Sequence, residues 1–195
     1  MKKLIKFQAK MFNKKASNPK NKPDEILKAL VLRPGQNIAD IGCGGGYFSL
    51  RFSDAIGKEG KIYVIDTNHV FLEIVRDNAR EKGLNNVETI LATEDKLHFP
   101  KKSLDLVFMR NVYHHLSNRS EYFRNLKGAL KPEGKIVIMD YKGSGFLSFH
   151  KLFGHYTSKE TIVEEMKKAG YALAKEYDFL PEQYFLIFTM VAGDI

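Results

Sequence analysis

The chain has 195 residues, which is enough for one domain with a sizeable core and too few for two full ones. Its single cysteine, Cys43, excludes an internal disulfide and favours a reducing, cytoplasmic location. No stretch is long and apolar enough to predict a transmembrane helix, and Lys6 and Lys10 interrupt the apolar core that a signal peptide would need.

Residues 1–22 form a basic leader before the expected domain, residues 23–195. The formal net charge is +8, and eight lysines precede the first acid, Asp24. Apolar residues from Leu4 to Phe12 predict a short amphipathic helix, which could lie on a membrane surface or fold back over a ligand cleft. The charge favours RNA, an anionic membrane surface or an acidic protein as partner, and a solvated basic tail is an equally good interpretation.

The rest of the chain is organised around residues 37–50, NIADIGCGGGYFSL. An apolar run ending at Ile41 predicts a strand buried on both faces. Four glycines follow, Gly42 and 44–46, and Tyr47 then opens a predicted helix. A strand, a glycine turn and a helix N-terminus together present free N–H groups to a ligand. Because these glycines cost backbone entropy and add no side-chain packing, a ligand-binding loop is favoured over a plain tight turn.

The glycine spacing distinguishes two classes of ligand. A dinucleotide fingerprint, G-x-G-x-x-G, would need a glycine where Tyr47 stands, which disfavours a nicotinamide oxidoreductase. The chain instead has D-x-G-x-G-x-G, from Asp40 to Gly46. A second apolar strand, KIYVID, ends at Asp66, where a carboxylate can accept hydrogen bonds from both hydroxyls of a ribose.

Helices and strands alternate along the remaining chain. Further strands are expected at 87–91, 104–109, 135–140, 171–177 and 184–190, with helices at 23–31, 70–83, 118–130 and 158–168. Five strands that alternate with helices imply a parallel sheet with right-handed crossovers. The last two strands have no helix between them, so they imply a hairpin and one antiparallel strand.

The glycine loop and Asp66 resemble the class I S-adenosylmethionine-dependent methyltransferases, and the resemblance runs from about Pro23 to the C-terminus. This family also closes its sheet with a C-terminal hairpin, and the tail is similar to a subgroup of small single-domain members. The resemblance implies an α/β fold, a Rossmann-like doubly wound seven-stranded sheet that is mostly parallel. It also implies S-adenosylmethionine as cofactor and S-adenosylhomocysteine as product.

The resemblance implies the residues that hold the cofactor. The loop 92–100 matches the region that contacts adenine; many relatives carry Asp at the place of Thr93, so Glu94 or Asp95 takes that role. Cys43 is interpreted as a small residue beside the cofactor and not as a nucleophile. The leader is not expected to build this site. The expected cofactor-binding residues are Asp40, Gly42, Cys43, Gly44, Gly46, Asp66, Thr67, Thr93, Glu94, Asp95 and Arg110.

On the acceptor side, the resemblance places Arg110 and Asn111 beside the reactive methyl group. The signature of amino-methylating relatives, Asn or Asp followed by Pro-Pro and an aromatic residue, is absent here, which argues against methylation of DNA adenine or glutamine amides. The histidine spacing predicts no metal site. Helix-start packing explains the adjacent histidines as well as catalysis does. The expected catalytic residues are Asn111, Tyr113, His114 and His115.

The apolar segment 143–156 follows the fifth expected strand and should cover the acceptor side of the cleft. A packed cap is the alternative interpretation. Its expected contacts with a small, partly apolar acceptor are Phe146, Phe149, His150 and His155. The sequence thus predicts methyl transfer from S-adenosylmethionine to an unidentified small molecule. A cofactor-binding module without catalysis, and an RNA- or protein-directed methyltransferase recruited by the leader, are the alternatives.

Overall fold

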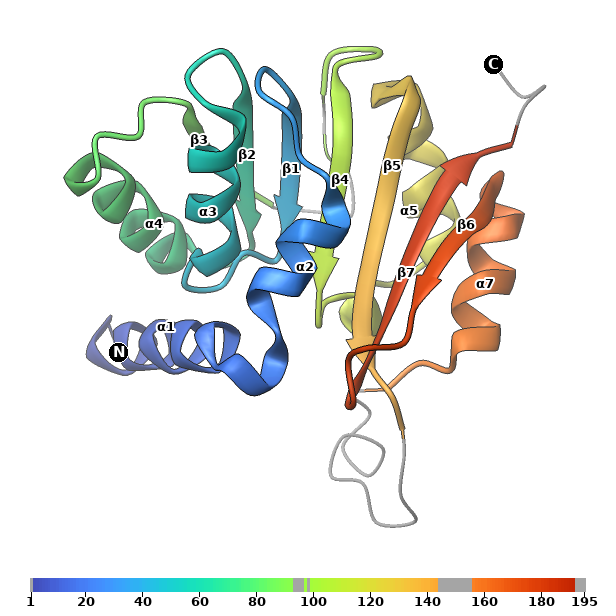
Figure 1. Ribbon diagram of the computed structural model, residues 1–195, viewed down its shortest axis with the longest axis horizontal. Coiled ribbons are helices and arrows are strands. Elements are labelled where there is room, and N and C mark those ends of the chain that lie inside the picture. Colours follow the sequence, from blue (N-terminus) through green and yellow to red (C-terminus); the bar gives the residue numbers. More distant parts are fainter. Residues whose placement is uncertain (1, 93–96, 98, 144–155, 192–195) are drawn as a thin grey trace. The chain divides into compact units, whose positions relative to one another are not determined.

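The computed structural model describes residues 2–92, 97, 99–143 and 156–191 (Figure 1). The chain divides into two units, Met1–Thr93 and Glu94–Ile195. The first contains three strands and their helices, and the second contains four strands and their helices. No helix among these residues is both long and apolar enough to cross a membrane.

The first unit is a parallel three-stranded layer with helices packed on it. β1 pairs with β2, and β2 pairs with β3, both in parallel register. Helix α3 packs on β1 and β2, and α4 packs on β2 and β3. The elements in chain order are α1 (Lys2–Ser17), the 3₁₀ turn η1 (Pro19–Asn21), α2 (Pro23–Leu30), β1 (Asn37–Ile41), α3 (Tyr47–Ile56), β2 (Lys61–Asp66), α4 (His69–Glu81) and β3 (Val87–Leu91).

Local sequence signals explain where these helices begin. Pro23 starts α2, and Asp24 and Glu25 place negative charge in its first turn. Asn68 caps α4, since its side chain accepts a hydrogen bond from the Val70 N–H at 3.0 Å. The predicted leader helix is confirmed, and it packs against α3 and α4.

The second unit combines parallel and antiparallel pairing. β4 and β5 are parallel, whereas β7 runs antiparallel to both of its neighbours, β5 and β6. Helix α7 packs on β6 and against α5. The elements are β4 (Leu104–Arg110), the 3₁₀ turn η2 (Tyr113–His115), α5 (Arg119–Leu126), the 3₁₀ turn η3 (Lys127–Ala129), β5 (Leu130–Tyr141), α7 (Lys159–Lys168), β6 (Tyr171–Tyr177) and β7 (Gln183–Met190).

The strand order is β3-β2-β1 in the first unit and β4-β5-β7-β6 in the second. This confirms the predicted fold class, an α/β, Rossmann-like seven-stranded sheet that is mostly parallel and closes with a C-terminal hairpin. The inner strands are buried on both faces: Val64 and Ile65 are adjacent in β2 and point to opposite faces, and both are fully buried.

One predicted boundary is wrong. The helix expected over 118–130 ends at Leu126, and β5 begins at Leu130 instead of Lys135. Pro132 disfavours helical geometry at the preceding residue, so the chain turns extended early. Leu104 pairs with Leu130 while Leu106 pairs with Lys135, and this register shift accommodates the extra residues as an irregularity in β5.

Candidate functional site

The glycine loop after β1 has the unusual backbone angles that its sequence predicts. Gly42, Gly44 and Gly46 have φ angles of +73°, +53° and +81°. Residues with a Cβ rarely adopt this left-handed region. The N–H groups of Gly42 and Cys43 both donate to the carbonyl oxygen of Ile65, at 2.8 and 3.1 Å, so the loop is fixed to the end of β2.

Close packing against two helices also requires glycine in this loop. A Cβ on Gly45 would lie 2.5 Å from the Ala9 carbonyl oxygen in α1, and one on Gly46 would lie 3.0 Å from a methyl group of Val75 in α4. The Gly45 distance is shorter than any real Cβ contact, and the other methyl group of Val75 would lie closer still to a Cβ on Gly46, so neither position accepts a side chain without a shift of its neighbours. Packing between the loop and these helices therefore explains part of the glycine content without a ligand.

Asp66 connects the loop to the end of β2. Its Oδ2 accepts from the Gly44 N–H at 3.0 Å, and its Oδ1 accepts from the Asn68 N–H at 2.9 Å. Partial burial raises the pKa of this carboxyl, and the backbone donors oppose that shift. Thr67 follows Asp66 and is exposed. Asp66 thus stands where the sequence predicts the ribose-binding acid, and that role remains a prediction.

Two further loop residues, Asp40 and Cys43, have perturbed pKa values. Asp40 is buried beneath the loop, and its carboxylate accepts a hydrogen bond from the Ser49 hydroxyl. Burial raises the pKa of Asp40 from 3.8 to about 7, and the charge of Asp66 adds to the shift. Burial and the two nearby carboxylates raise the pKa of the Cys43 thiol well above its usual range. A protonated thiol is a poor nucleophile, and the interpretation of Cys43 as a small residue beside the cofactor stays a prediction.

Helix α1 contacts the glycine loop directly. The Asn13 amide donates to the Gly45 carbonyl oxygen at 2.8 Å. The Phe12 ring packs edge-on against Phe71 of α4, with 5.8 Å between centroids, and a Cβ on Gly44 would lie 3.2 Å from that ring. Helix α1 therefore buttresses the loop, while the expectation that the leader does not build the cofactor site stays a prediction.

In the second unit, polar side chains gather where β4 ends. Asn111 has a φ angle of +57°, a conformation that persists only when surrounding bonds hold it. The Arg110 guanidinium donates to the Gln183 side-chain oxygen at 3.0 and 3.3 Å, and the Gln183 amide donates to the Asn111 side chain. Gln183, which is 4% exposed, was not among the predicted residues.

His114 and Asp140 form a buried pair at the ends of β4 and β5. The Asp140 carboxylate is fully buried and lies 2.8 Å from His114 Nδ1, and it also accepts from the His114 backbone N–H at 3.1 Å. A carboxylate in this position fixes the orientation of the imidazole ring. The adjacent His115 is exposed, and its ring lies against that of His114, with 4.1 Å between the ring centroids. Asp140 was missed, because only its place at a strand end indicated it.

Tyr113 packs inside the second unit, and its expected role as a catalytic residue stays a prediction. The side chain is fully buried, and its hydroxyl donates to Glu165 Oε2 at 2.6 Å. Arg119 donates to the same carboxylate at 2.8 Å, and the Tyr113 ring stacks on Phe123. Burial and Glu165 raise the pKa of the hydroxyl. These contacts join η2 to α5 and α7 and leave the ring inside the core.

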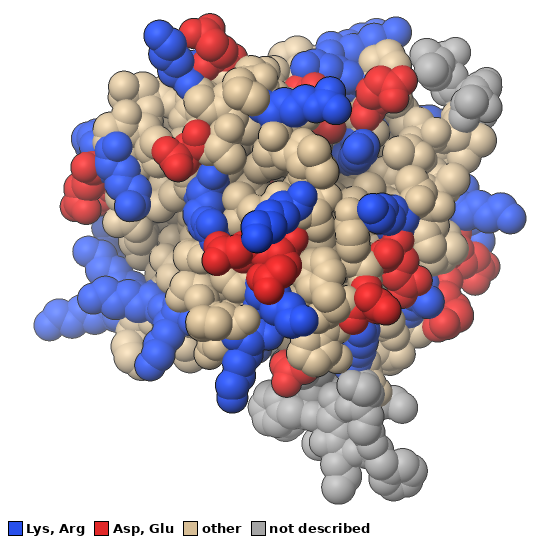
Figure 2. Space-filling view, viewed as in Figure 1, with Lys and Arg blue, Asp and Glu red and all other residues tan. Residues whose placement is uncertain are grey.

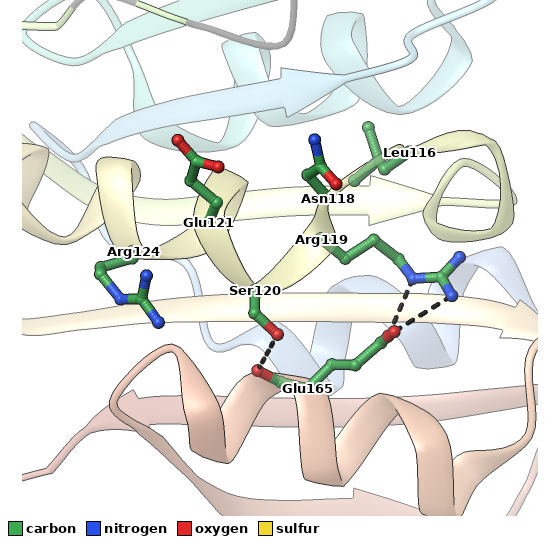
Figure 3. A pocket seen from close by; sticks show the side chains of 7 residues that line it. All are labelled: Leu116, Asn118, Arg119, Ser120, Glu121, Arg124 and Glu165. Carbon is green, nitrogen blue, oxygen red and sulfur yellow. Dashed lines mark hydrogen bonds and ion pairs between the residues drawn. The ribbon is translucent and has the colours of Figure 1, made fainter.

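A pocket of about 490 Å³ lies between α5 and α7 (Figure 3). Its lining is polar, and the Arg119–Glu165 ion pair lies in its wall (Figure 3). None of the predicted site residues lines this pocket, so it does not mark the expected acceptor site. The lining residues are Leu116, Asn118, Arg119, Ser120, Glu121, Arg124 and Glu165.

Several predicted residues lie outside the described part of the chain: Thr93, Glu94 and Asp95 of the adenine loop, and Phe146, Phe149, His150 and His155 of the cap. Among the residues that the structure describes, no group of three or more His, Cys, Asp or Glu side chains is arranged to hold a metal ion.

A family profile described as "Methyltransferase domain" matches residues 39–138, from β1 into β5. The glycine loop, Asp66 and the region of Asn111 and His114 all fall within this match. The chain therefore belongs to the methyltransferase domain family, as a class I S-adenosylmethionine-dependent member.

Individual relatives give a narrower comparison. The chain is 25% identical over 160 residues to the ubiquinone/menaquinone biosynthesis C-methyltransferase UbiE of Shewanella frigidimarina, a match that covers 80% of this chain and 62% of that protein. It is 27% identical over 126 residues to the protein of the same name from Vibrio vulnificus, covering 64% and 48%. The chain thus spans between 48% and 62% of the length of these two relatives.

Solved structures share the fold. A S-adenosylmethionine-dependent methyltransferase from Aquifex aeolicus matches with a TM-score of 0.80 at 24% identity, over 93% of this chain and 98% of that chain. The [4+2]-cyclase SpnF matches with a TM-score of 0.71 at 18% identity, over 87% and 80%. At these identities the likeness shows the architecture alone.

The raised pKa of Asp40 leads us to predict that the free energy of unfolding depends on pH. Its folded pKa of about 7 lies above its ordinary 3.8, so the folded state binds the proton more tightly and the free energy of unfolding falls as pH rises between those values. Asp40→Asn removes this effect. Relative to the wild type, the variant should gain on the order of 3 kcal/mol between pH 4 and pH 8. Urea unfolding at both pH values measures the gain, with exposed Asp77→Asn as control; equal effects at both pH values would contradict the assignment.

The hydrogen bond from Asn13 to the glycine loop leads us to predict that α1 supports cofactor binding. Asn13→Ala removes the hydrogen bond to the Gly45 carbonyl oxygen and should weaken the binding of S-adenosylhomocysteine about fivefold. Isothermal titration calorimetry measures this, with Lys6→Ala, an exposed position in the same helix, as the matched control. Unchanged affinity in Asn13→Ala, with helix content preserved, would show that the contact only anchors the helix.

Proposed function

We propose that this methyltransferase transfers the methyl group of S-adenosylmethionine to a carbon atom of a small, partly apolar acceptor. The observation that supports a nucleoside cofactor is the glycine loop, which Asp66 holds in place. The left-handed glycines bring backbone close to a ligand, and Asp66 presents a carboxylate beside them, which fits the ribose of a nucleoside cofactor. The names of the two relatives, both C-methyltransferases of quinone biosynthesis, support a carbon acceptor.

The cofactor supplies an activated methyl group on a sulfonium with a neutral leaving group. The protein therefore contributes mainly alignment, and a base where the acceptor must lose a proton. A carbon acceptor of the quinol type has such a need, because removing a hydroxyl proton makes the ring carbon more nucleophilic.

His114 is the residue we assign to this proton, and Asp140 is its positioning residue. The buried Asp140 carboxylate holds the ring orientation and stabilises the imidazolium that forms when the ring takes a proton. Arg110 and Asn111 remain the proposed contacts on the same side, held by Gln183. His115, which is exposed beside His114, remains a proposed substrate contact.

Two alternative functions are compared with this proposal: a cofactor-binding module without catalysis, and a methyltransferase directed to RNA or protein. The [4+2]-cyclase SpnF has the same architecture, so the fold alone does not define the reaction. A cofactor-binding module without catalysis would bind S-adenosylmethionine and turn over no acceptor. A methyltransferase directed to RNA or protein would methylate those macromolecules in preference to small molecules. The His114–Asp140 pair favours catalysis on a small acceptor, since binding alone needs no oriented imidazole.

Asp66 tests the cofactor site. Asp66→Ala removes the acceptor for the ribose hydroxyls and for the Gly44 N–H, so binding of S-adenosylmethionine should weaken by roughly tenfold to a hundredfold. Calorimetry measures the affinity, and Asp77→Ala, on the exposed face of α4, serves as the matched control. Absence of binding by the wild type, or equal affinities in the two variants, would refute the proposed site.

His114 tests the reaction. With short-chain hydroquinones as acceptors, His114→Gln should lower kcat by roughly a hundredfold or more, while the affinity for S-adenosylmethionine stays within about twofold. Asp140→Asn should lower kcat and shift the pH profile of kcat, because Asp140 positions the proposed base. Loss of a merely structural carboxylate would leave that pH profile in place. Exposed His69→Gln is the control. Wild-type turnover in His114→Gln would remove the base assignment, and turnover of no acceptor by the wild type would favour the binding module.

A further inference from the structure

Helix α1 has an inner and an outer face with different chemistry. On the inner face, Ala9 is 1% exposed and Asn13 bonds the glycine loop. Three large apolar side chains lie on the opposite side, at positions i, i+3 and i+7: Leu4, Phe7 and Met11, which are 63%, 65% and 49% exposed. A helix that only packed on the domain would not need apolar side chains on its solvent side.

Lysines border this apolar stripe. Lys3, Lys10 and Lys14 recur along one edge of it with helical spacing, and each is exposed. Helix α1 contains no Asp or Glu, so nothing on the helix itself neutralises them. Figure 2 shows lysine and arginine side chains extending at the lower left, where α1 lies in Figure 1.

We infer that this outer face, defined as Leu4, Phe7, Met11, Lys3, Lys10 and Lys14, docks in the plane of an anionic lipid bilayer. The apolar side chains enter the boundary between headgroups and acyl chains, while the lysines contact the lipid phosphates. The inference rests on α1 alone and is independent of the proposed acceptor.

A bilayer fits this face better than RNA does. RNA phosphates would engage the lysines, but Leu4 and Met11 offer neither charge nor an aromatic surface on which a base could stack. Both side chains would stay exposed to water in such a complex. A bilayer uses all six residues, because it presents negative charge and an apolar layer within about 10 Å of each other.

The experiment uses the full chain and vesicles of phosphatidylcholine mixed with phosphatidylglycerol, compared with vesicles of phosphatidylcholine alone. Co-sedimentation measures binding. One variant combines Leu4→Ser, Phe7→Ser and Met11→Ser; its matched control combines Val31→Ser, Leu173→Ser and Val191→Ser, which are exposed apolar positions elsewhere. A second variant combines Lys3→Gln, Lys10→Gln and Lys14→Gln; its control combines Lys58→Gln, Lys101→Gln and Lys167→Gln.

We expect the wild type to bind the anionic vesicles and not the neutral ones. The lysine variant should bind on the order of a hundredfold more weakly, and the apolar variant at least about tenfold more weakly, with both controls near wild type. Circular dichroism verifies that the variants keep their helix content, and single Phe7→Ser, which removes one exposed ring, should show the same direction if a triple variant misfolds.

Three results would overturn the inference. The first is absence of wild-type binding to anionic vesicles at low salt. The second is an equal loss in the α1 variants and their controls, which would indicate an effect of net charge or apolar content that is not specific to this face. The third is lysine-dependent binding to a single-stranded RNA oligonucleotide without binding to vesicles, which would identify RNA as the partner.

Discussion

Three hydrogen bonds donated by backbone N–H groups hold the glycine loop of the first unit in its shape. The N–H groups of Gly42 and Cys43 reach the Ile65 carbonyl, and that of Gly44 reaches the Asp66 carboxylate, so the end of β1 is tied to the end of β2. The left-handed angles of the loop are sterically costly for residues with a Cβ, and glycine accepts them. The Asp66 carboxylate therefore has a structural role in holding the loop, in addition to its proposed role in binding the ribose.

Helix α1 connects the loop to the surface of the first unit. Its Asn13 bonds the loop carbonyl of Gly45, and the close approach of Ala9 requires that position to be glycine. The same helix presents its apolar and basic outer face to the surroundings. A surface that engages the outer face would restrict the motion of α1, and through Asn13 it would also restrict the loop. Docking and cofactor affinity would then be linked by one rigid element.

Sequence periodicity located most elements because each is defined by neighbouring residues. The bounds of β3 and β6 match the prediction, since Asn86 precedes β3, and Gly170 and Asp178 flank β6. The features that the sequence did not predict depend on contacts that are distant in sequence. Tyr113 is buried by Glu165, 52 residues away, and His114 is oriented by Asp140, 26 residues away. For the same reason, the sequence left open whether the leader folds back over the cleft, because Asn13 meets Gly45 only in the fold.

The two adjacent residues Tyr113 and His114 show how one short turn can separate structure from chemistry. Tyr113 donates a hydrogen bond to Glu165 and stacks on Phe123, and these contacts anchor η2 on the helices of the second unit. The anchor fixes the backbone of His114, whose N–H and ring both meet Asp140. If His114 is the base that we propose, a ring held from two sides would lose less entropy on proton transfer than the ring of a mobile histidine. The immobility of Tyr113 would thus support the proposed role of His114 as a base.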